Sequence, residues 1–323
     1  MNLCLVGYGS IARSHMEALK GERVTLHSVM GRLPDATAAF AAEFGFSRHI
    51  TNLDEALADP AIDAVLITSP TDLHAEQTEK ALRAGKHALV EIPLATSLAE
   101  ADALDRLARQ VDRRLMVCHT QRYYPPLVEA RRWIADGRLH VHHVSCRYAF
   151  FRRENVNWAG RRRSWTDNLL WHHGCHAVDT CLWLLGATDA TVQSQTAPPT
   201  QHLNIPMDLD ILMRTPDDRL VAVNMSYNTK ITYNEYLLIG EETTLLATNN
   251  RLVSPDGPLV EEGAAFGPSN NPIKEQDREF LAAVRDGREP ALSPAAIRPA
   301  MKVLQTVQDQ YEDAKRKKQN ANE

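Results

Sequence analysis

The chain has 323 residues, 44% of them hydrophobic, and a formal net charge of -5 from 36 Lys+Arg against 41 Asp+Glu. At about 100–200 residues per domain, this length predicts two domains, each with its own hydrophobic core. Nucleic-acid-binding domains usually carry a basic surplus, so the acidic balance argues against that class. Every apolar run falls short of the ~18–20 residues that cross a bilayer, and the N-terminus lacks the pattern of a signal peptide. We therefore expect neither a nucleic acid nor a membrane as a partner.

The cysteines indicate the redox environment. Five are scattered along the chain without a Cys-x-x-Cys pair: Cys4, Cys118, Cys146, Cys175 and Cys181. This spacing is typical of reduced thiols, so we expect a cytoplasmic protein.

Apolar strands alternate with helices over the first third of the chain. The strands are expected at residues 2–6, 24–30, 63–68, 87–91 and 115–119, and the helices at 10–20, 35–44, 72–84 and 97–113. Short apolar strands connected by helices are typical of a parallel sheet that helices cover on both faces. We therefore predict an α/β, doubly wound Rossmann domain over residues 1–120.

The pattern changes after residue 120. Helices are expected at 125–136 and 168–185, a long strand at 139–151, and β-prone segments separated by turn residues from 191 to 260. Two further helices are expected at 275–286 and 294–315. We predict a substrate-binding α+β domain with an open, mainly antiparallel sheet over 121–290, followed by a C-terminal helix and tail over 291–323.

A glycine-rich motif is the strongest functional signal: the first strand is followed by Gly7-Tyr8-Gly9-Ser10-Ile11-Ala12, which opens a helix. In a dinucleotide-binding turn the first glycine permits the tight turn, and the second lets a pyrophosphate approach the backbone at the helix N-terminus. We expect Gly7, Gly9, Ser10 and Ile11 to bind the cofactor. A glycine pattern alone is weak evidence, and the alternative is an ordinary glycine-rich turn.

The end of the second strand indicates which dinucleotide binds. NAD sites usually place a carboxylate there, whereas this chain has Met30-Gly31-Arg32, and the nearest acid, Asp35, lies beyond a proline. Because an arginine can hydrogen-bond a 2′-phosphate that a carboxylate would repel, we expect NADP, with NAD as a weaker alternative. In the other interpretation Arg32 is a solvated surface charge and both cofactors are used.

The third expected strand ends with Thr68, Ser69 and Pro70. Because open α/β sheets bind their ligands at the carboxyl ends of the strands, we expect these residues to contact the cofactor. His74 follows at the start of the next helix, where it either contacts the cofactor or lies on the surface.

Together these motifs resemble the glucose–fructose oxidoreductase / inositol dehydrogenase / MocA family over nearly the whole chain. The resemblance rests on GYGSIA, TSPTDLH, Val90-Glu91-Ile92-Pro93 and Gly174-x-His176-x-x-Asp179. It implies a Rossmann domain, a second domain built on an open antiparallel sheet, and a homodimer or homotetramer formed through that sheet. It also implies that Glu91, Ile92 and Pro93 bind the cofactor.

Two positions depart from the family pattern. Ile92 stands where the family usually has a lysine that contacts the reacting hydroxyl, and His172 stands where an aspartate is usual. Either the activity is lost or the site uses another substrate. The second alternative is favoured by YAFFRRENVNWAG and RRSWTDNLLWHHGCHAVD, which resemble the 4-carboxy-2-hydroxymuconate-6-semialdehyde dehydrogenase branch of the family.

That branch implies an anionic substrate, a cyclic hemiacetal with two carboxylates, which NADP oxidises to 2-pyrone-4,6-dicarboxylate in the degradation of protocatechuate and lignin-derived aromatics. Fixed cations must hold such a substrate, and the fork of an arginine pairs bidentately with a carboxylate. We expect this role from Arg122, Arg152, Arg153 and Arg163. For Arg161 and Arg162 we favour a solvated face or a subunit contact.

Oxidation of a hemiacetal also needs a base, and histidine titrates near neutral pH. His176 lies three and four residues after His173 and His172, so the three side chains share one helix surface. We predict His176 as the general base, oriented by Asp179, with His172 and His173 relaying the proton or binding the substrate. A zinc site needs more ligands than this cluster offers, so we expect no metal. A purely structural helix is the alternative.

Two tryptophans precede the histidines in the chain. Trp165 and Trp171 are candidates for the wall of the nicotinamide or substrate pocket, and core packing is an equal alternative for Trp171.

Two other functions of the protein stay open. A sugar or polyol dehydrogenase is disfavoured because a neutral polyol needs no cluster of cations, and a catalytically silent nucleotide-binding regulator is disfavoured by the histidine-rich helix.

Overall fold

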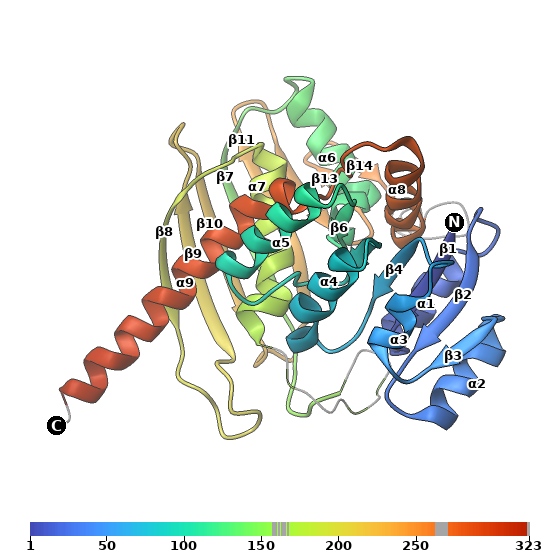
Figure 1. Cartoon of the computed structure of the whole chain (residues 1–323). Helices are drawn as coiled ribbons and strands as arrows, with labels where there is room; N and C mark the ends of the chain where they lie inside the picture. Colours follow the sequence, from blue (N-terminus) through green and yellow to red (C-terminus); the bar gives the residue numbers. More distant parts are fainter. Residues whose placement is uncertain (157–159, 161, 163–165, 167, 262–270, 322–323) are drawn as a thin grey trace. The chain divides into compact units, whose positions relative to one another are not determined.

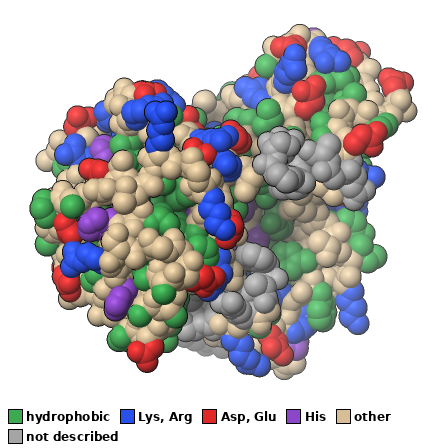
Figure 2. Space-filling model, turned by 90° about the vertical axis from the view of Figure 1, so that its right-hand side faces the viewer, with side chains coloured by type: hydrophobic (Ala, Val, Ile, Leu, Met, Phe, Trp, Pro, Cys, Tyr) green, Lys and Arg blue, Asp and Glu red, His purple; other side chains and the backbone are tan. Residues whose placement is uncertain are grey.

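The computed structural model describes the chain apart from residues 157–159, 161, 163–165, 167, 262–270 and 322–323 (Figure 1). The chain divides into two compact units: Met1–His119 with Ile273–Arg298, and Thr120–Pro272 with Pro299–Glu323. Among the described residues, no helix combines the length and the apolar composition that crossing a membrane requires. Lys and Arg side chains are interspersed with Asp and Glu on the face shown in Figure 2.

The first unit is built on a six-stranded sheet with the strand order β3-β2-β1-β4-β5-β6. All neighbours pair in parallel. The strands are β1 (Asn2–Val6), β2 (Thr25–Met30), β3 (Arg48–Ile50), β4 (Ala64–Ile67), β5 (His87–Val90) and β6 (Leu115–Val117). The direction of winding reverses between β1 and β4, which is the topological switch point where such sheets bind ligands. The predicted doubly wound Rossmann fold is confirmed.

Helices connect these strands: α1 (Ser10–Ala18), α2 (Pro34–Phe44), α3 (Leu53–Ala58), α4 (His74–Arg83) and α5 (Leu98–Gln110). Strand β3 and helix α3 were not expected from the sequence. Only Ile50 of the three β3 residues is buried, so the strand lacks an apolar run. Helix α3 has six residues, and its clearest signal is the N-cap Asn52, whose side chain accepts a hydrogen bond from the backbone N–H of Glu55.

Helix α8 (Pro272–Asp286) packs with the first unit, although the sequence analysis assigned residues up to 290 to the second domain. The helix buries Phe280 and Ala283 and carries Asp277 into contact with His15. The residues that follow α8 stay with the same unit, because the N–H of Val117 in β6 donates to the carbonyl of Leu292. The predicted last helix is observed as α9 (Pro294–Asn320).

The second unit contains an eight-stranded sheet with the order β14-β13-β12-β11-β7-β10-β9-β8. Strands β7 (Val141–Ala149) and β10 pair in parallel, and the other described pairs are antiparallel. The remaining strands are β8 (Thr191–Thr196), β9 (Asp208–Arg214), β10 (Leu220–Ser226), β11 (Tyr233–Gly240), β12 (Thr244–Thr248), β13 (Leu252–Ser254) and β14 (Gly257–Val260). The predicted α+β domain with a mainly antiparallel sheet is confirmed.

Alternation along the strands directs one face of this sheet to the core. In β9 and β10, Ile211, Val223 and Met225 are at most 1% exposed, whereas their neighbours in the chain face outward. Helix α6 (Pro125–Ala135) packs on β12 to β14, and α7 (Cys175–Leu185) packs on β7 and β10. The predicted helix over 168–185 is not regular, because Leu170–Gly174 form a π-helical turn, η3, before α7 begins.

Candidate active site

The glycine-rich turn of the first unit has the geometry of a dinucleotide site. Gly7 has a φ of +94°, and a Cβ atom on it would lie 2.8 Å from the backbone nitrogen of Ser69. Its N–H donates to the carbonyl of Met30 at 2.9 Å, and the hydroxyl of Thr68 donates to the Gly7 carbonyl at 3.1 Å. Only glycine fits a position with this φ and this close backbone approach. The turn is thus locked to the ends of both β2 and β4.

Gly9 caps the N-terminus of α1 without a side-chain hydrogen bond. A Cβ atom on Gly9 would meet no heavy atom within 4 Å, so open space lies over this helix end. The first backbone N–H groups of a helix lack internal partners and attract anions. The turn therefore fits the pyrophosphate of a dinucleotide, which the backbone around Gly9, Ser10 and Ile11 would hold.

The end of β2 lacks an acidic side chain, as the sequence shows, and Arg32 is exposed there. Tyr8, a residue that the sequence analysis did not single out, packs its ring directly on Gly31: a Cβ atom at Gly31 would lie 2.0 Å from the ring. Its position between Gly7 and Gly9 is the feature of the sequence that could have pointed to it. Its ring therefore lies against the backbone of Gly31, next to Arg32 in the chain.

His74 is buried at the carboxyl edge of the sheet, so the surface alternative for it is wrong. Its Nδ1 lies 2.8 Å from the carbonyl oxygen of Pro93, and its Nε2 lies 2.9 Å from that of Ser69. The imidazole therefore links the loop after β4 to the loop after β5. The predicted cofactor residues Thr68, Ser69 and Pro70 lie in the first of these loops, and Ile92 and Pro93 lie in the second, joined by a cis peptide bond.

Glu91, which directly follows β5, belongs to a buried network that the sequence analysis missed. His15 of α1 places its Nε2 2.9 Å from Glu91 Oε1 and its Nδ1 2.8 Å from Asp277 Oδ2. His15 and Asp277 are separated by 262 positions in the chain, so no local pattern could predict this contact.

Burial by itself opposes a charge on His15, but the Asp277 carboxylate and the hydrogen bonds to Asp277 and Glu91 outweigh it and raise the pKa of His15 to about 10. His15, Glu91 and Cys118 have donor atoms within 4.8 Å of one another. Because both ring nitrogens of His15 already bind carboxylates, this geometry favours a hydrogen-bonded network over a metal site.

The second unit brings a histidine and two arginines together at the carboxyl ends of β7 and β10. Because these strands are parallel, Arg152 and Arg153, which follow β7, reach the same edge as Tyr227, which follows β10. The N–H of Arg152 donates to the Tyr227 carbonyl at 2.9 Å, and Arg153 Nη1 donates to the same oxygen at 3.2 Å. The Tyr227 hydroxyl hydrogen-bonds His173 Nδ1. We call Arg152, Arg153, His173 and Tyr227 the histidine–arginine cluster.

Aromatic rings surround His173. The ring centroids of Tyr148, Phe150 and Tyr227 lie 5.3, 5.2 and 5.6 Å from that of His173. His172 packs against it edge-on at 4.5 Å, and both residues project from the π-helical turn η3. His176 is half-buried in the first turn of α7. The three predicted histidines therefore lie on adjoining turns, and Tyr227 is the partner that sequence reasoning missed.

Arg122 and Asp179 have a different environment from the one predicted. Arg122 donates from Nε and Nη2 to the two oxygens of Asp179, at 2.8 and 2.6 Å. Asp179, expected to orient His176, thus holds Arg122, which was expected to bind the substrate. Trp171 is buried and donates to Gln308, as its core-packing alternative predicts. The predicted residues Arg161, Arg163 and Trp165 lie outside the described residues, and the described Arg162 is exposed beside Glu154.

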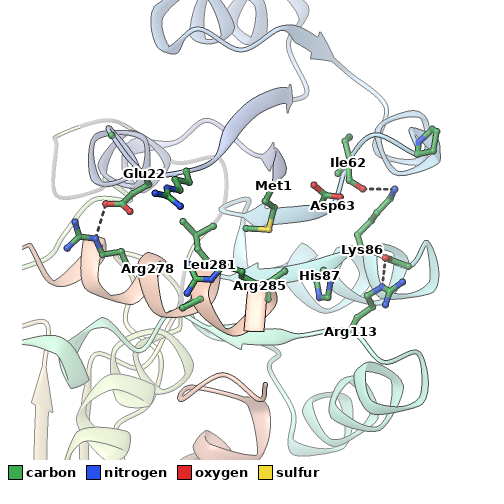
Figure 3. A pocket seen from close by; sticks show the side chains of 16 residues that line it. Met1, Glu22, Ile62, Asp63, Lys86, His87, Arg113, Arg278, Leu281 and Arg285 are labelled. Carbon is green, nitrogen blue, oxygen red and sulfur yellow. Dashed lines mark hydrogen bonds and ion pairs between the residues drawn. The ribbon is translucent and has the colours of Figure 1, made fainter. Parts of the chain in front are cut away.

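A cavity of about 940 Å³ opens elsewhere in the first unit, at the amino ends of the parallel strands (Figure 3). Its cations bind protein groups: Lys86 donates to the carbonyls of Asp59 and Ile62, and Arg278 pairs with Glu22. His87 also lines it, and burial, with Arg113 and Arg114 nearby, lowers the pKa of His87 to about 4. Rossmann sheets bind nucleotides at the opposite edge, so this cavity is not the nucleotide site.

Comparisons with known proteins agree with this architecture. The family profile described as "Oxidoreductase family, NAD-binding Rossmann fold" (GFO_IDH_MocA) matches residues 1–119, and that of "Bacterial oxidoreductases, C-terminal" matches residues 127–262. The 4-carboxy-2-hydroxymuconate-6-semialdehyde dehydrogenase of a Sphingobium species is 34% identical over 314 residues, which cover 97% of this chain and 99% of that protein. The chain belongs to the Gfo/Idh/MocA oxidoreductase family.

A second curated relative and a solved structure share less sequence with this chain. Inositol 2-dehydrogenase of Rhizobium meliloti is 25% identical over 308 residues, 90% of each chain. The crystal structure of levoglucosan dehydrogenase in complex with NADH superimposes with a TM-score of 0.83 at 18% identity and covers 96% of each chain. The family assignment supports a dehydrogenase with a nicotinamide cofactor.

Proposed function

We propose that the protein oxidises the hemiacetal of 4-carboxy-2-hydroxymuconate-6-semialdehyde to 2-pyrone-4,6-dicarboxylate in aromatic degradation, with NADP as the preferred acceptor. One observation carries the proposal: the backbone N–H of Arg152 and the guanidinium of Arg153 donate to the carbonyl of Tyr227, whose hydroxyl hydrogen-bonds His173. Arg152 is only 7% exposed, and its guanidinium donates to Asn155 Oδ1 at 2.9 Å and lies over the ring of Tyr227. Arginine forks in such sites pair bidentately with carboxylates, and the substrate carries two of them.

The reaction removes a proton and a hydride from one H–C–O–H group and forms the C=O bond of a lactone. A bound nicotinamide supplies the hydride acceptor. We assign the hydroxyl proton to His176 as general base, with His172 and His173 binding the substrate or relaying the proton. Imidazole suits this role because its ordinary pKa, about 6.5, lies near the working pH. Replacement of His176 by alanine is expected to lower turnover by about 10²–10⁴-fold.

The preference for NADP is inferred from the end of β2. Arg32 is exposed there with no acidic side chain at positions 30 to 34. A guanidinium can donate hydrogen bonds to a 2′-phosphate, whereas the carboxylate of an NAD site would repel the phosphate. We assign the pyrophosphate to the Gly7–Ile11 turn and the nicotinamide half to the loops after β4 and β5.

A homo-oligomer through the large sheet is also proposed. The outward face of that sheet carries exposed apolar side chains on three of its strands: Leu212 on β9 (58% exposed), Leu220 on β10 (44%) and Ile239 on β11 (36%). Exposed apolar groups on one face often mark a protein–protein contact. We expect a homodimer or homotetramer in the cytoplasm.

The test uses the purified protein and the semialdehyde, made enzymatically from protocatechuate, with NADP or NAD as acceptor. We expect absorbance of reduced nicotinamide to appear with the semialdehyde, and more efficiently with NADP. Turnover of myo-inositol but not of the semialdehyde would instead identify a polyol dehydrogenase. Saturable binding of NADPH without turnover of either compound would identify a regulator.

A further inference from the structure

His15 has no role in the reaction described above, although it lies next to the nucleotide site. It belongs to α1, the helix that opens at the glycine-rich turn, and its side chain is fully buried. One ring nitrogen binds the carboxylate of Asp277 and the other binds that of Glu91. The helix of the glycine-rich turn is thus connected through one imidazole to the end of β5.

The carboxylate of Glu91 connects His15 to the loop that begins at Glu91. Its Oε1 accepts the hydrogen bond from His15, while its Oε2 accepts one from the N–H of Ile92 at 3.2 Å. On the other side of the same loop, the carbonyl of Pro93 lies 2.8 Å from His74 Nδ1. Two buried imidazoles therefore hold the Glu91–Pro93 loop, His15 at its first residue and His74 at its last.

The topology of the sheet indicates which half of a dinucleotide this loop serves. Strand β2, which ends near Arg32, lies on one side of β1, whereas β4 and β5 lie on the other. A dinucleotide bound across the switch point places its adenosine half over the β2 side and its nicotinamide half over the β4–β5 side. The Glu91–Pro93 loop therefore lies on the nicotinamide side.

We propose that His15 is a positioning residue that fixes the Glu91–Pro93 loop and thereby the nicotinamide half of the cofactor. It acts through Glu91 and touches neither the cofactor nor the substrate. The inference depends on the proposed function only for the nicotinamide cofactor and not for the identity of the substrate. If His15 only stabilised the fold of α1, its replacement would instead weaken binding of both halves of the dinucleotide, because the N-terminus of α1 holds the pyrophosphate that joins them.

The test compares the binding of NADP with that of its fragment 2′-phospho-ADP-ribose, which lacks the nicotinamide. In His15→Gln we expect the affinity for NADP to fall by about 10-fold while the affinity for the fragment stays within about twofold of wild type. Adding Glu91→Gln should cause little further loss, because both changes break one connection. His87→Gln is the matched control: it removes an imidazole from the opposite end of β5 and should change neither affinity.

Equal losses for NADP and the fragment, or no loss for either, would overturn the proposal. If His15→Gln does not fold, Asp277→Asn takes its place, since it keeps the shape of the site and removes one charge that holds the ring. Unchanged NADP affinity in that folded variant would also overturn it. Failure of the proposed function is seen separately, as absent binding or turnover in the wild type.

Discussion

Arg122 and Asp179 form a bidentate ion pair within the second unit, with N–O distances of 2.8 and 2.6 Å. The Asp179 side chain is 2% exposed and that of Arg122 is 13% exposed. Asp179 lies three residues after His176 in α7, so the pair ties the chain after β6 to the helix that carries the proposed base. The pair therefore holds in place the helix that carries the proposed base.

Removing one partner of this pair should be costly. Arg122→Met is expected to lower the free energy of unfolding by about 3–5 kcal/mol, because it leaves the buried Asp179 carboxylate without the guanidinium. The double variant Arg122→Met with Asp179→Leu should recover much of this loss, since no unpaired charge is left. Urea unfolding followed by circular dichroism measures both. Equal stability of the single variant and the wild type would show that the pair contributes nothing.

Alanine at Gly7 should impair folding, whereas alanine at Gly9 should impair cofactor binding. Gly7→Ala places a Cβ atom 2.8 Å from the backbone of Ser69 at a φ of +94°, so it should destabilise the fold. Gly9→Ala meets no protein atom within 4 Å and should fold normally. Its methyl group would stand where we place the pyrophosphate, so its NADP affinity should fall by at least about 10-fold. Wild-type NADP affinity in Gly9→Ala would remove the pyrophosphate from this turn.

Arg32 should determine cofactor preference. Arg32→Ala is expected to weaken NADP binding by about 10- to 100-fold, as expected for a lost charge-assisted contact to the 2′-phosphate, and to leave NAD binding nearly unchanged. Fluorescence titration with NADPH and NADH gives both affinities. Arg23, an exposed arginine in the turn before β2, provides the matched control. Equal changes for both cofactors would contradict the assignment.

His15 predicts a pH-dependent stability. Its pKa rises from 6.5 to about 10 on folding, so the charged ring stabilises the fold fully below 6.5, and this contribution is lost as the pH rises through 10. Asp277, Glu91, Gln276 and Cys118 face this site, and burial raises the pKa of Cys118 well above its ordinary value. The difference in unfolding free energy between the wild type and His15→Gln should therefore shrink between about pH 7 and pH 10. A constant difference over this range would show that His15 is neutral in the folded protein.

The sequence predicted the fold well because both units follow simple patterns. Buried strands such as β4 are continuous apolar runs in the sequence. A glycine-rich turn such as Gly7–Ala12, between a strand and a helix, is typical of a dinucleotide-binding βαβ unit. Strand β3 was not predicted because two of its three residues, Arg48 and His49, are exposed and polar, so the strand lacks an apolar run. Helix α8 was assigned to the wrong unit because its amphipathic pattern shows that one face is buried, but not against which sheet.

The candidate site was predictable only where its residues are close in the chain. His172, His173 and His176 stand out as a group, whereas Tyr227, which hydrogen-bonds His173, lies 54 positions away in the chain. Arg122 was not predicted as a partner of Asp179, because the two residues lie 57 positions apart in the chain, whereas His176 lies close to Asp179 by helical spacing. An ion pair between residues so far apart in the chain leaves no pattern in the sequence near either residue.

The central claim is that the histidine–arginine cluster serves the oxidation of an anionic semialdehyde by a nicotinamide cofactor. It is tested most directly with semialdehyde that carries deuterium on its aldehyde carbon, in single turnovers of the wild type and of Arg152→Gln. We predict one deuterium in the NADPH for each pyrone dicarboxylate formed, and a much weaker affinity for the substrate in the variant. Deuterium that is retained in the product, or no transfer from this substrate by the wild type, would contradict the account.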